Sequence, residues 1–155
     1  MDRVRWCFGL KGGLREYEPN ERLAKSYLEE AKSSLERADK NFKDGDLLWT
    51  TVVIYYAEYY ALYSFLQRIG FKCENHFCSI LTVESLLGED KSKIINDHKK
   101  KRIDAQYYMR IDKKKEVMVM LDEAKMFVSM FDDIVSNLND KEIKKYRDSL
   151  KKKKP

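Results

Sequence analysis

The chain has 155 residues, of which 43% are hydrophobic and 37% charged, which suits one domain with one core and a well-solvated surface. Its six glycines and two prolines are few for a fold with many turns, so the composition argues against a many-stranded sheet and favours a few long helices. The formal net charge of +5 equals the charge of residues 139–155, which hold eight Lys or Arg and three acids.

Residues 1–19 are predicted to form an N-terminal arm. Aromatic residues and glycines occur there without a helical period, and we expect Trp6, Phe8 and Leu10 to lie on the body of the protein. No long apolar run follows Met1, so no secretory signal is predicted. The three cysteines are an odd number, which favours free thiols in a reducing cytoplasm.

The first long helix is expected to begin at Pro19-Asn20 and to end at Gly45. Its apolar residues recur at spacings of mostly three and four, the pattern of one buried helix face. They are Leu23, Tyr27, Leu28, Ala31, Leu35, Ala38 and Phe42.

The stretch from Asp46 to Arg68 is the one around which the other helices are expected to pack. It is long enough to cross a bilayer, and a helix that is apolar all round lies in a core or a membrane. Its tyrosines occupy the middle, whereas a membrane helix carries tyrosine at the interfaces, so we predict a buried core helix and no membrane span. Asp46 and Gly70 are the expected caps. The one charge inside, Glu58, is expected to bond tyrosine hydroxyls or to face a dimer partner.

The segments after the central helix are shorter and more polar. Asn75 is expected to cap a helix from His76 to Leu87, which Gly88 ends. Residues 89–101 are predicted to form a short helix or loop, and residues 102–111 an irregular segment.

The last part of the chain is predicted to contain one long helix and one short one. Asp112 is expected to cap a helix that continues to about Leu138. Asn139 and Glu142 resemble a capping box that opens the last helix, and the lysines after it are expected to be a solvated tail. The prediction is an all-α, up-and-down helical bundle of about five to six helices, with its domain at 20–138 and a basic C-terminal helix and tail at 139–155.

Four pieces of the sequence form a recognisable series. They are the opening helix with Ala24, Tyr27, Leu28 and Ala31, the aromatic run Tyr55 to Leu62, the Gly70-to-His76 turn, and the R-x-x-A-x-Y pattern of Arg102, Ala105 and Tyr107. In this order they resemble the HEPN family, small helical domains named for higher eukaryotes and prokaryotes nucleotide-binding. The resemblance covers about residues 20 to 138.

The resemblance implies a helical bundle that usually dimerises and that acts on or around nucleotides or RNA. It also implies a small nucleotidyltransferase as a possible partner protein in a toxin–antitoxin-type system. Many members are RNases whose motif has an arginine, roughly four to six residues and then a histidine, whereas Arg68 and His76 have seven residues between them. His98 has no arginine at that distance before it.

The basic segment 91–115 is the predicted binding region, because it holds ten basic and three acidic residues. Aromatic side chains among cations can stack on bases while the cations contact phosphates. The candidate nucleotide- or RNA-binding residues are Lys99, Lys100, Lys101, Arg102, Tyr107 and Arg110. An ordinary solvated charged surface is the alternative interpretation.

Two other functions stay open from the sequence. In a metal-independent RNase, His76 or His98 would be the acid–base group and Arg102 would stabilise the phosphate. The other possibility is a structural subunit without a ligand. Cys73, His76 and Cys78 supply three potential zinc ligands where a structural site takes four, and no cofactor motif is present, so neither a metal nor a cofactor is predicted.

Overall fold

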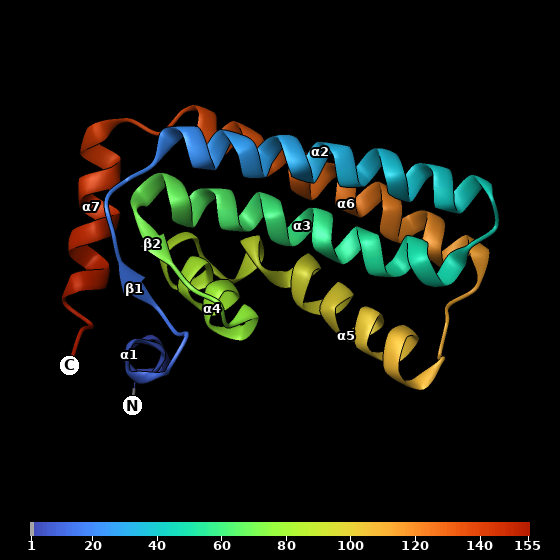
Figure 1. The fold of residues 1–155 in the computed structure, drawn as a ribbon, viewed down its shortest axis with the longest axis horizontal. Coiled ribbons are helices and arrows are strands. Elements are labelled where there is room, and N and C mark those ends of the chain that lie inside the picture. Colours follow the sequence, from blue (N-terminus) through green and yellow to red (C-terminus); the bar gives the residue numbers. More distant parts are fainter. Residues whose placement is uncertain (1) are drawn as a thin grey trace.

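The computed structural model describes residues 2–155, and Figure 1 shows their fold. Its α-helices are α1 (Arg3–Gly9), α2 (Glu21–Lys43), α3 (Leu47–Ile69), α4 (His76–Leu87), α5 (Lys93–Tyr108), α6 (Lys114–Ser136) and α7 (Asp140–Lys151). A 3-10 helix, η1 (Glu89–Lys91), connects α4 to α5, and strands β1 (Arg15–Glu16) and β2 (Phe71–Lys72) pair antiparallel. The predicted all-α helical bundle is confirmed.

The helix α3 lies at the centre, with α2 and α6 on one side of it and α4 and α5 on the other (Figure 1). Its ends are those predicted: the Asp46 side chain accepts a hydrogen bond from the Trp49 N–H, and Gly70 adopts a left-handed φ of 85°. A Cβ at position 70 would also collide with the Arg147 guanidinium and with the backbone at Pro19, so only glycine fits. Within residues 2–155, no helix is both long enough and apolar enough to traverse a bilayer.

The prediction of an irregular segment at residues 102–111 is wrong for most of its length, because α5 continues without a break to Tyr108. Ile95, His98 and Ala105 are buried along one side of α5. Because the polar residue His98 occupies one position of this buried face, the apolar residues of the segment do not show the spacing of a helix. The helix ends at Met109, a non-glycine residue with a left-handed φ of 54°.

The helix α6 begins without the predicted Asp112 cap. Its N-cap is Lys113, which makes no side-chain capping bond. The Asp112 carboxylate instead pairs with the Lys101 ammonium at 2.9 Å. The capping box that opens α7 is confirmed, with the Asn139 side chain accepting from the Glu142 N–H.

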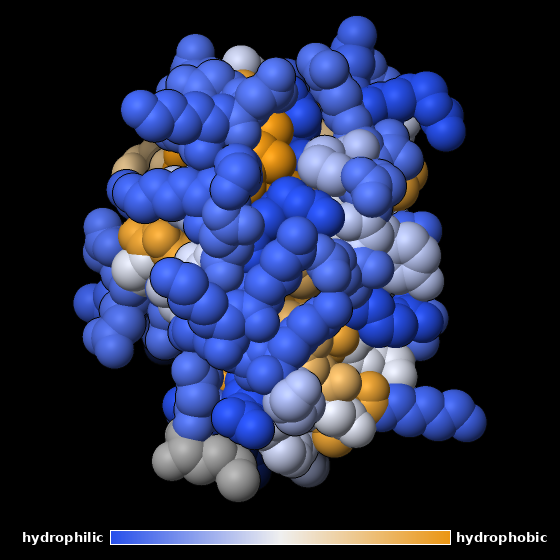
Figure 2. Space-filling view, turned by 90° about the vertical axis from the view of Figure 1, so that its left-hand side faces the viewer, coloured by the Kyte–Doolittle hydropathy of each residue, from blue (hydrophilic) through white to orange (hydrophobic). Residues whose placement is uncertain are grey.

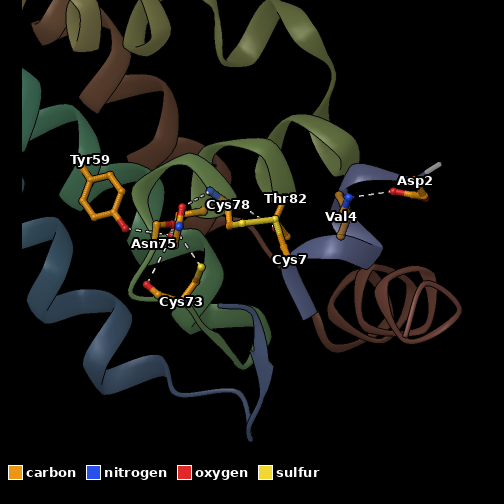
Figure 3. The surroundings of a disulfide bond; sticks show 9 residues. Asp2, Val4, Cys7, Tyr59, Cys73, Asn75, Cys78 and Thr82 are labelled. Atoms are coloured by element: carbon orange, nitrogen blue, oxygen red, sulfur yellow. Dashed lines mark hydrogen bonds between the residues drawn. A yellow bond between two sulfur atoms is a disulfide. The ribbon is translucent and has the colours of Figure 1, made fainter. Parts of the chain in front are cut away.

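The N-terminal arm contains a helix that the sequence pattern did not reveal. The side chains of Val4 and Cys7 on α1 are buried, whereas Trp6 is 48% exposed. Cys7 forms a disulfide with Cys78 of α4 (Figure 3), so the prediction of free thiols is wrong for these two residues. Cys73 is free and buried.

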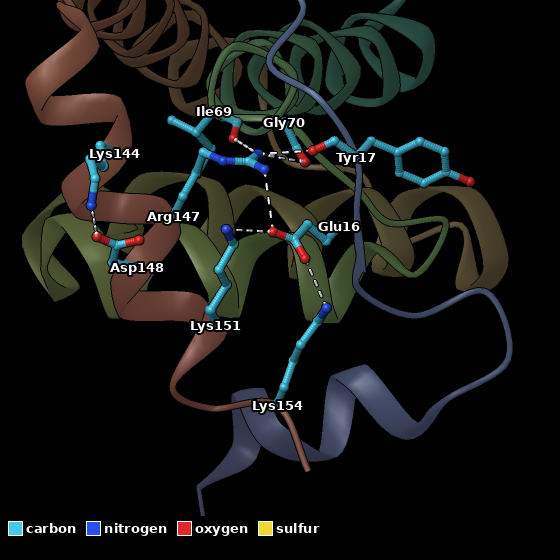
Figure 4. A network of polar contacts seen from close by, with 9 residues as sticks. All are labelled: Glu16, Tyr17, Ile69, Gly70, Lys144, Arg147, Asp148, Lys151 and Lys154. Carbon is cyan, nitrogen blue, oxygen red and sulfur yellow. Dashed lines mark hydrogen bonds and ion pairs between the residues drawn. The ribbon is translucent and has the colours of Figure 1, made fainter.

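The basic C-terminal residues are not a solvated tail. Arg147, Lys151 and Lys154 all bond the Glu16 carboxylate of β1, and Arg147 also donates to the carbonyl of Ile69 at 2.8 Å (Figure 4). This end of the molecule is covered mostly by hydrophilic side chains (Figure 2). The α7 helix therefore packs against the strands that precede α2 and follow α3.

Candidate functional site

The buried side of α5 joins the centre of the bundle through His98. Its Nδ1 lies 2.7 Å from Glu58 Oε2 of α3, and its Nε2 lies 3.5 Å from Glu123 Oε1 of α6. Glu58 is fully buried and His98 is 3% exposed. Glu58 therefore bonds a histidine, and the prediction that it bonds tyrosine hydroxyls or faces a partner is wrong. Because one ring nitrogen of His98 bonds the buried Glu58, the other faces the partly exposed Glu123, and the ring is almost fully buried, His98 is not available to a ligand.

The pKa values of this pair both shift upward. Burial raises the pKa of Glu58 to about 7, although the hydrogen bond with His98 acts in the opposite direction. Burial by itself lowers the pKa of His98, but the hydrogen bond and the charge of Glu58 outweigh it and raise the pKa. Glu58 and His98 therefore share a proton over a wide pH range, and neither group is buried as an unpaired charge.

Arg102 lies one helical turn beyond His98 and faces a different environment. Its guanidinium carbon sits 4.9 Å from the ring centroid of Tyr55 and 5.7 Å from that of Tyr56, both on α3. Its Nη1 donates to Gln106 Oε1 at 3.0 Å, whereas its Nε is buried without a hydrogen-bond partner. Two tyrosine faces thus hold the cation in place and leave part of its hydrogen-bonding fork unused.

His76, the first residue of α4, also lies against Tyr55 and Tyr56, with ring centroids 5.9 and 6.2 Å away. Its Nδ1 and the Tyr55 hydroxyl share a hydrogen bond of 2.9 Å, and its ring stacks on Tyr59 with the centroids 3.8 Å apart. Burial, followed by the charges of Arg102 and Lys99, lowers the pKa of His76 to about 4. The imidazole is therefore neutral at neutral pH.

Lys99 completes the group. Its ammonium lies 5.7 Å from the ring centroid of Phe77, the second residue of α4. Burial and the neighbouring charge of Arg102 lower the pKa of Lys99. Within residues 2–155, neither Lys99 nor Arg102 takes part in an ion pair with a carboxylate. We call Lys99, Arg102, His76, Tyr55 and Tyr56 the Arg102 cluster.

The other predicted binding residues lie outside this cluster. Lys100 is exposed, and Lys101 is neutralised by Asp112 at 2.9 Å. Tyr107 is 66% exposed at the end of α5. Arg110 lies over the ring of Tyr108 at 5.6 Å. The structure thus brings His76, Lys99 and Arg102 together, whereas His98 is buried in the core. The other four candidates are exposed along α5 and the connection to α6, namely Lys100, Lys101, Tyr107 and Arg110.

The three potential metal ligands do not act together. Cys78 is bonded to Cys7, and the Cys73 thiol donates to the carbonyl of Asn75 at 3.3 Å. His76 has the Tyr55 hydroxyl as its Nδ1 partner.

Sequence reasoning missed the residues that hold the cluster together. The sequence predicts Tyr55 and Tyr56 as part of the buried aromatic helix and Phe77 as an apolar residue of the next helix, but nothing in it indicates that they, or Gln106, contact Arg102 or Lys99. A tyrosine pair on a buried helix indicates a cation-binding surface only when the helix packed against it carries an arginine without a carboxylate partner. The sequence does not show which helices pack against each other.

Chemically, the Arg102 cluster has features that favour a negatively charged ligand. Two cations without carboxylate partners lie beside the N-terminus of a 12-residue helix, whose backbone dipole also favours negative charge. An arginine fork matches phosphate or carboxylate oxygens.

Comparison with known proteins gives one match. The family model of the HEPN domain matches residues 24–134 of the chain. Neither the comparison with curated proteins nor the comparison with solved structures yields a match. The family match spans α2 through nearly all of α6 and includes every residue of the Arg102 cluster. Its length and its agreement with the all-helical fold lead to one conclusion: the chain belongs to the HEPN domain family.

Proposed function

We propose that this HEPN domain binds the phosphate groups of nucleotides or RNA at the Arg102 cluster. Membership of the family supports a nucleotide- or RNA-related module in general. The observation that carries the proposal is Arg102 itself, whose guanidinium lies over two tyrosine rings and has no carboxylate partner within residues 2–155. A phosphate oxygen would accept from the terminal nitrogens of this guanidinium, and its negative charge would offset the burial and the repulsion from Arg102 that lower the pKa of Lys99.

Binding fits the cluster better than hydrolysis does. A general acid or base works best when its pKa lies near the working pH. The pKa of His76 is lowered to about 4, so at neutral pH its ring is uncharged, is almost never protonated and is a weak base. His98 is hydrogen-bonded to Glu58 in the core and lies outside the cluster. The cluster therefore supplies charge and orientation without a proton-transfer group suited to RNA cleavage.

The proposal is tested by fluorescence anisotropy with labelled RNA and with a labelled nucleotide. Arg102→Lys keeps the charge but loses the planar fork, so the affinity should fall about tenfold. Lys25→Ala is the matched control, because Lys25 is an exposed residue of α2. Figure 1 shows that α2 lies on the opposite side of α3 from α4 and α5. Equal affinities for wild type, Arg102→Lys and Lys25→Ala would refute binding at this cluster.

A protein partner is the second part of the proposal. The helix α6 exposes Met118, Val119 and Met126 at 47%, 52% and 65%, and apolar, adaptable side chains at a surface favour contact with another protein. We expect a homodimer and, in a toxin–antitoxin-type system, a nucleotidyltransferase partner. Met126→Glu should weaken self-association in sedimentation experiments. A wild-type monomer at high micromolar concentration would contradict the dimer.

A further inference from the structure

Beside the Arg102 cluster, α1 contributes an aromatic side chain that the core does not use. Trp6 of α1 packs edge-on against Phe77 of α4, with ring centroids 6.4 Å apart and planes at 75°. Trp6 is 48% exposed and Phe77 41% exposed. Large aromatic side chains normally bury more of their surface than this, so the pair presents ring surface to solvent.

Positive charge surrounds this pair. The Arg3 guanidinium carbon lies 5.1 Å from the Phe77 ring centroid, and the Lys99 ammonium lies 5.7 Å from it. Lys99 also belongs to the Arg102 cluster, so the aromatic surface and the phosphate site share a side chain. Phe77 follows His76 directly at the start of α4. The two features form one continuous surface across α1, α4 and α5.

The support under Trp6 is rigid. The disulfide from Cys7 to Cys78 fixes α1 to the first turn of α4, next to Phe77 (Figure 3). The Leu14 N–H donates to the Cys7 carbonyl at 2.9 Å, and Val4 and Leu14 are buried. A side chain on a fixed element loses little conformational freedom when a ligand arrives, which favours binding.

We propose that Trp6 and Phe77 form a stacking platform for an unpaired base of single-stranded RNA. The inference rests on the proposed phosphate site, since the backbone of the same nucleotide chain would lie at Lys99 and Arg102. Arg3 would contact a neighbouring phosphate. Aromatic platforms among cations hold single strands in this way, and a duplex, whose bases are already stacked, would not use the platform. Phe77 lies within residues 24–134, whereas Trp6 and Arg3 lie outside them, so residues beyond the matched HEPN domain complete the platform.

Tryptophan fluorescence tests the platform directly. The chain has two tryptophans, so Trp49→Phe leaves Trp6 as the only tryptophan, and its emission is separated from that of the tyrosines by exciting at the red edge of the absorption band. A single-stranded oligouridine should quench this emission, and the quenching should saturate over the concentration range in which anisotropy reports binding. The same length of RNA duplex should bind more weakly and should leave the emission nearly unchanged.

Variants separate the platform from the phosphate site. Trp6→Ala should weaken binding of the single strand roughly tenfold and leave binding of inorganic tripolyphosphate unchanged. Trp49→Ala, which removes a comparably exposed tryptophan from α3, is the control and should bind both probes like wild type. Thermal unfolding of each variant verifies that the fold persists.

Each failure has a distinct meaning. If oligouridine binds without quenching Trp6 and Trp6→Ala keeps wild-type affinity, the platform is wrong while the phosphate site stands, provided that Arg102→Lys still weakens binding. If Trp6→Ala loses tripolyphosphate as well as RNA, Trp6 supports the phosphate site and does not stack a base. If wild type binds neither RNA nor tripolyphosphate, both proposals are wrong.

Discussion

Glu58 Oε2 and His98 Nδ1 lie 2.7 Å apart in the interior of the bundle, and this bond fixes α5 against α3. Arg102 follows His98 by one turn of α5, so the same bond sets where Arg102 meets Tyr55. The other carboxylate oxygen, Glu58 Oε1, is buried without a hydrogen-bond partner. The pair therefore matters for stability and for the position of the site, although it touches no ligand.

Breaking this pair should be costly. His98→Leu would leave the Glu58 carboxyl buried without its partner, and we expect a loss of about 3 kcal/mol or more in the free energy of unfolding. The double variant Glu58→Leu with His98→Leu should recover part of that loss, because no buried polar group is left unpaired. Urea denaturation measures both. A loss below about 1 kcal/mol for His98→Leu would contradict the role assigned to the pair.

The pH dependence of stability should carry the signature of His76. Its pKa is lowered from 6.5 to about 4 by folding. Between these values the unfolded chain binds a proton that the folded protein does not, so stability contributed by neutral His76 is lost as pH falls through this window. The unfolding free energy of wild type, minus that of His76→Gln, should therefore rise as pH increases from 4 to 6.5 and then level off. A difference that stays flat with pH would mean that His76 is not desolvated.

The disulfide should stabilise the protein measurably. Cys7 and Cys78 are separated by 71 positions, and closing a loop of that length stabilises by up to about 4 kcal/mol through the unfolded state. A dithiol reductant should lower the unfolding free energy of wild type and leave that of Cys7→Ser unchanged. Denatured, unreduced protein should show one reactive thiol, that of Cys73. Three reactive thiols would contradict the bond.

Arg147 should be the most important residue of the C-terminal helix outside its apolar face. Its Nη1 donates to the carbonyls of Ile69 at 2.8 Å and Tyr17 at 2.9 Å (Figure 4). Arg147→Ala should lower the unfolding free energy by about 2 kcal/mol, because the partly buried carbonyls lose their donor. Lys145→Ala, an exposed neighbour on α7, should change it by less than about 0.5 kcal/mol. Similar effects for the two variants would show that α7 is only loosely attached.

Local signals explain what the sequence could predict. The caps at Asn20, Asp46, Asn75 and Asn139 are satisfied within three residues of themselves, so each is readable from its own neighbourhood. The boundaries of α2, α3, α4 and α7 follow from them.

Features that depend on distant partners could not be predicted. His98 completes the buried face of α5 only because Glu58, 40 positions earlier, supplies its partner. The tail lysines gain their partner in Glu16, at the opposite end of the chain. Of the predicted site residues, His76, Lys99 and Arg102 come together for the same reason: α4 and α5 both pack on the tyrosines of α3. No local pattern contains that arrangement.

The most direct test of the proposed function is the salt dependence of RNA binding. Each phosphate contact with a single strand contributes about 0.7 to the slope of log affinity against log salt concentration. The double variant Lys99→Ala with Arg102→Ala should make this negative slope shallower, reducing its magnitude by up to about 1.4. The control, Lys93→Ala with Lys100→Ala, removes two exposed charges from the same helix and should keep nearly the wild-type slope. Equal slopes for wild type and the Lys99/Arg102 variant, with folding intact, would contradict phosphate binding at the Arg102 cluster.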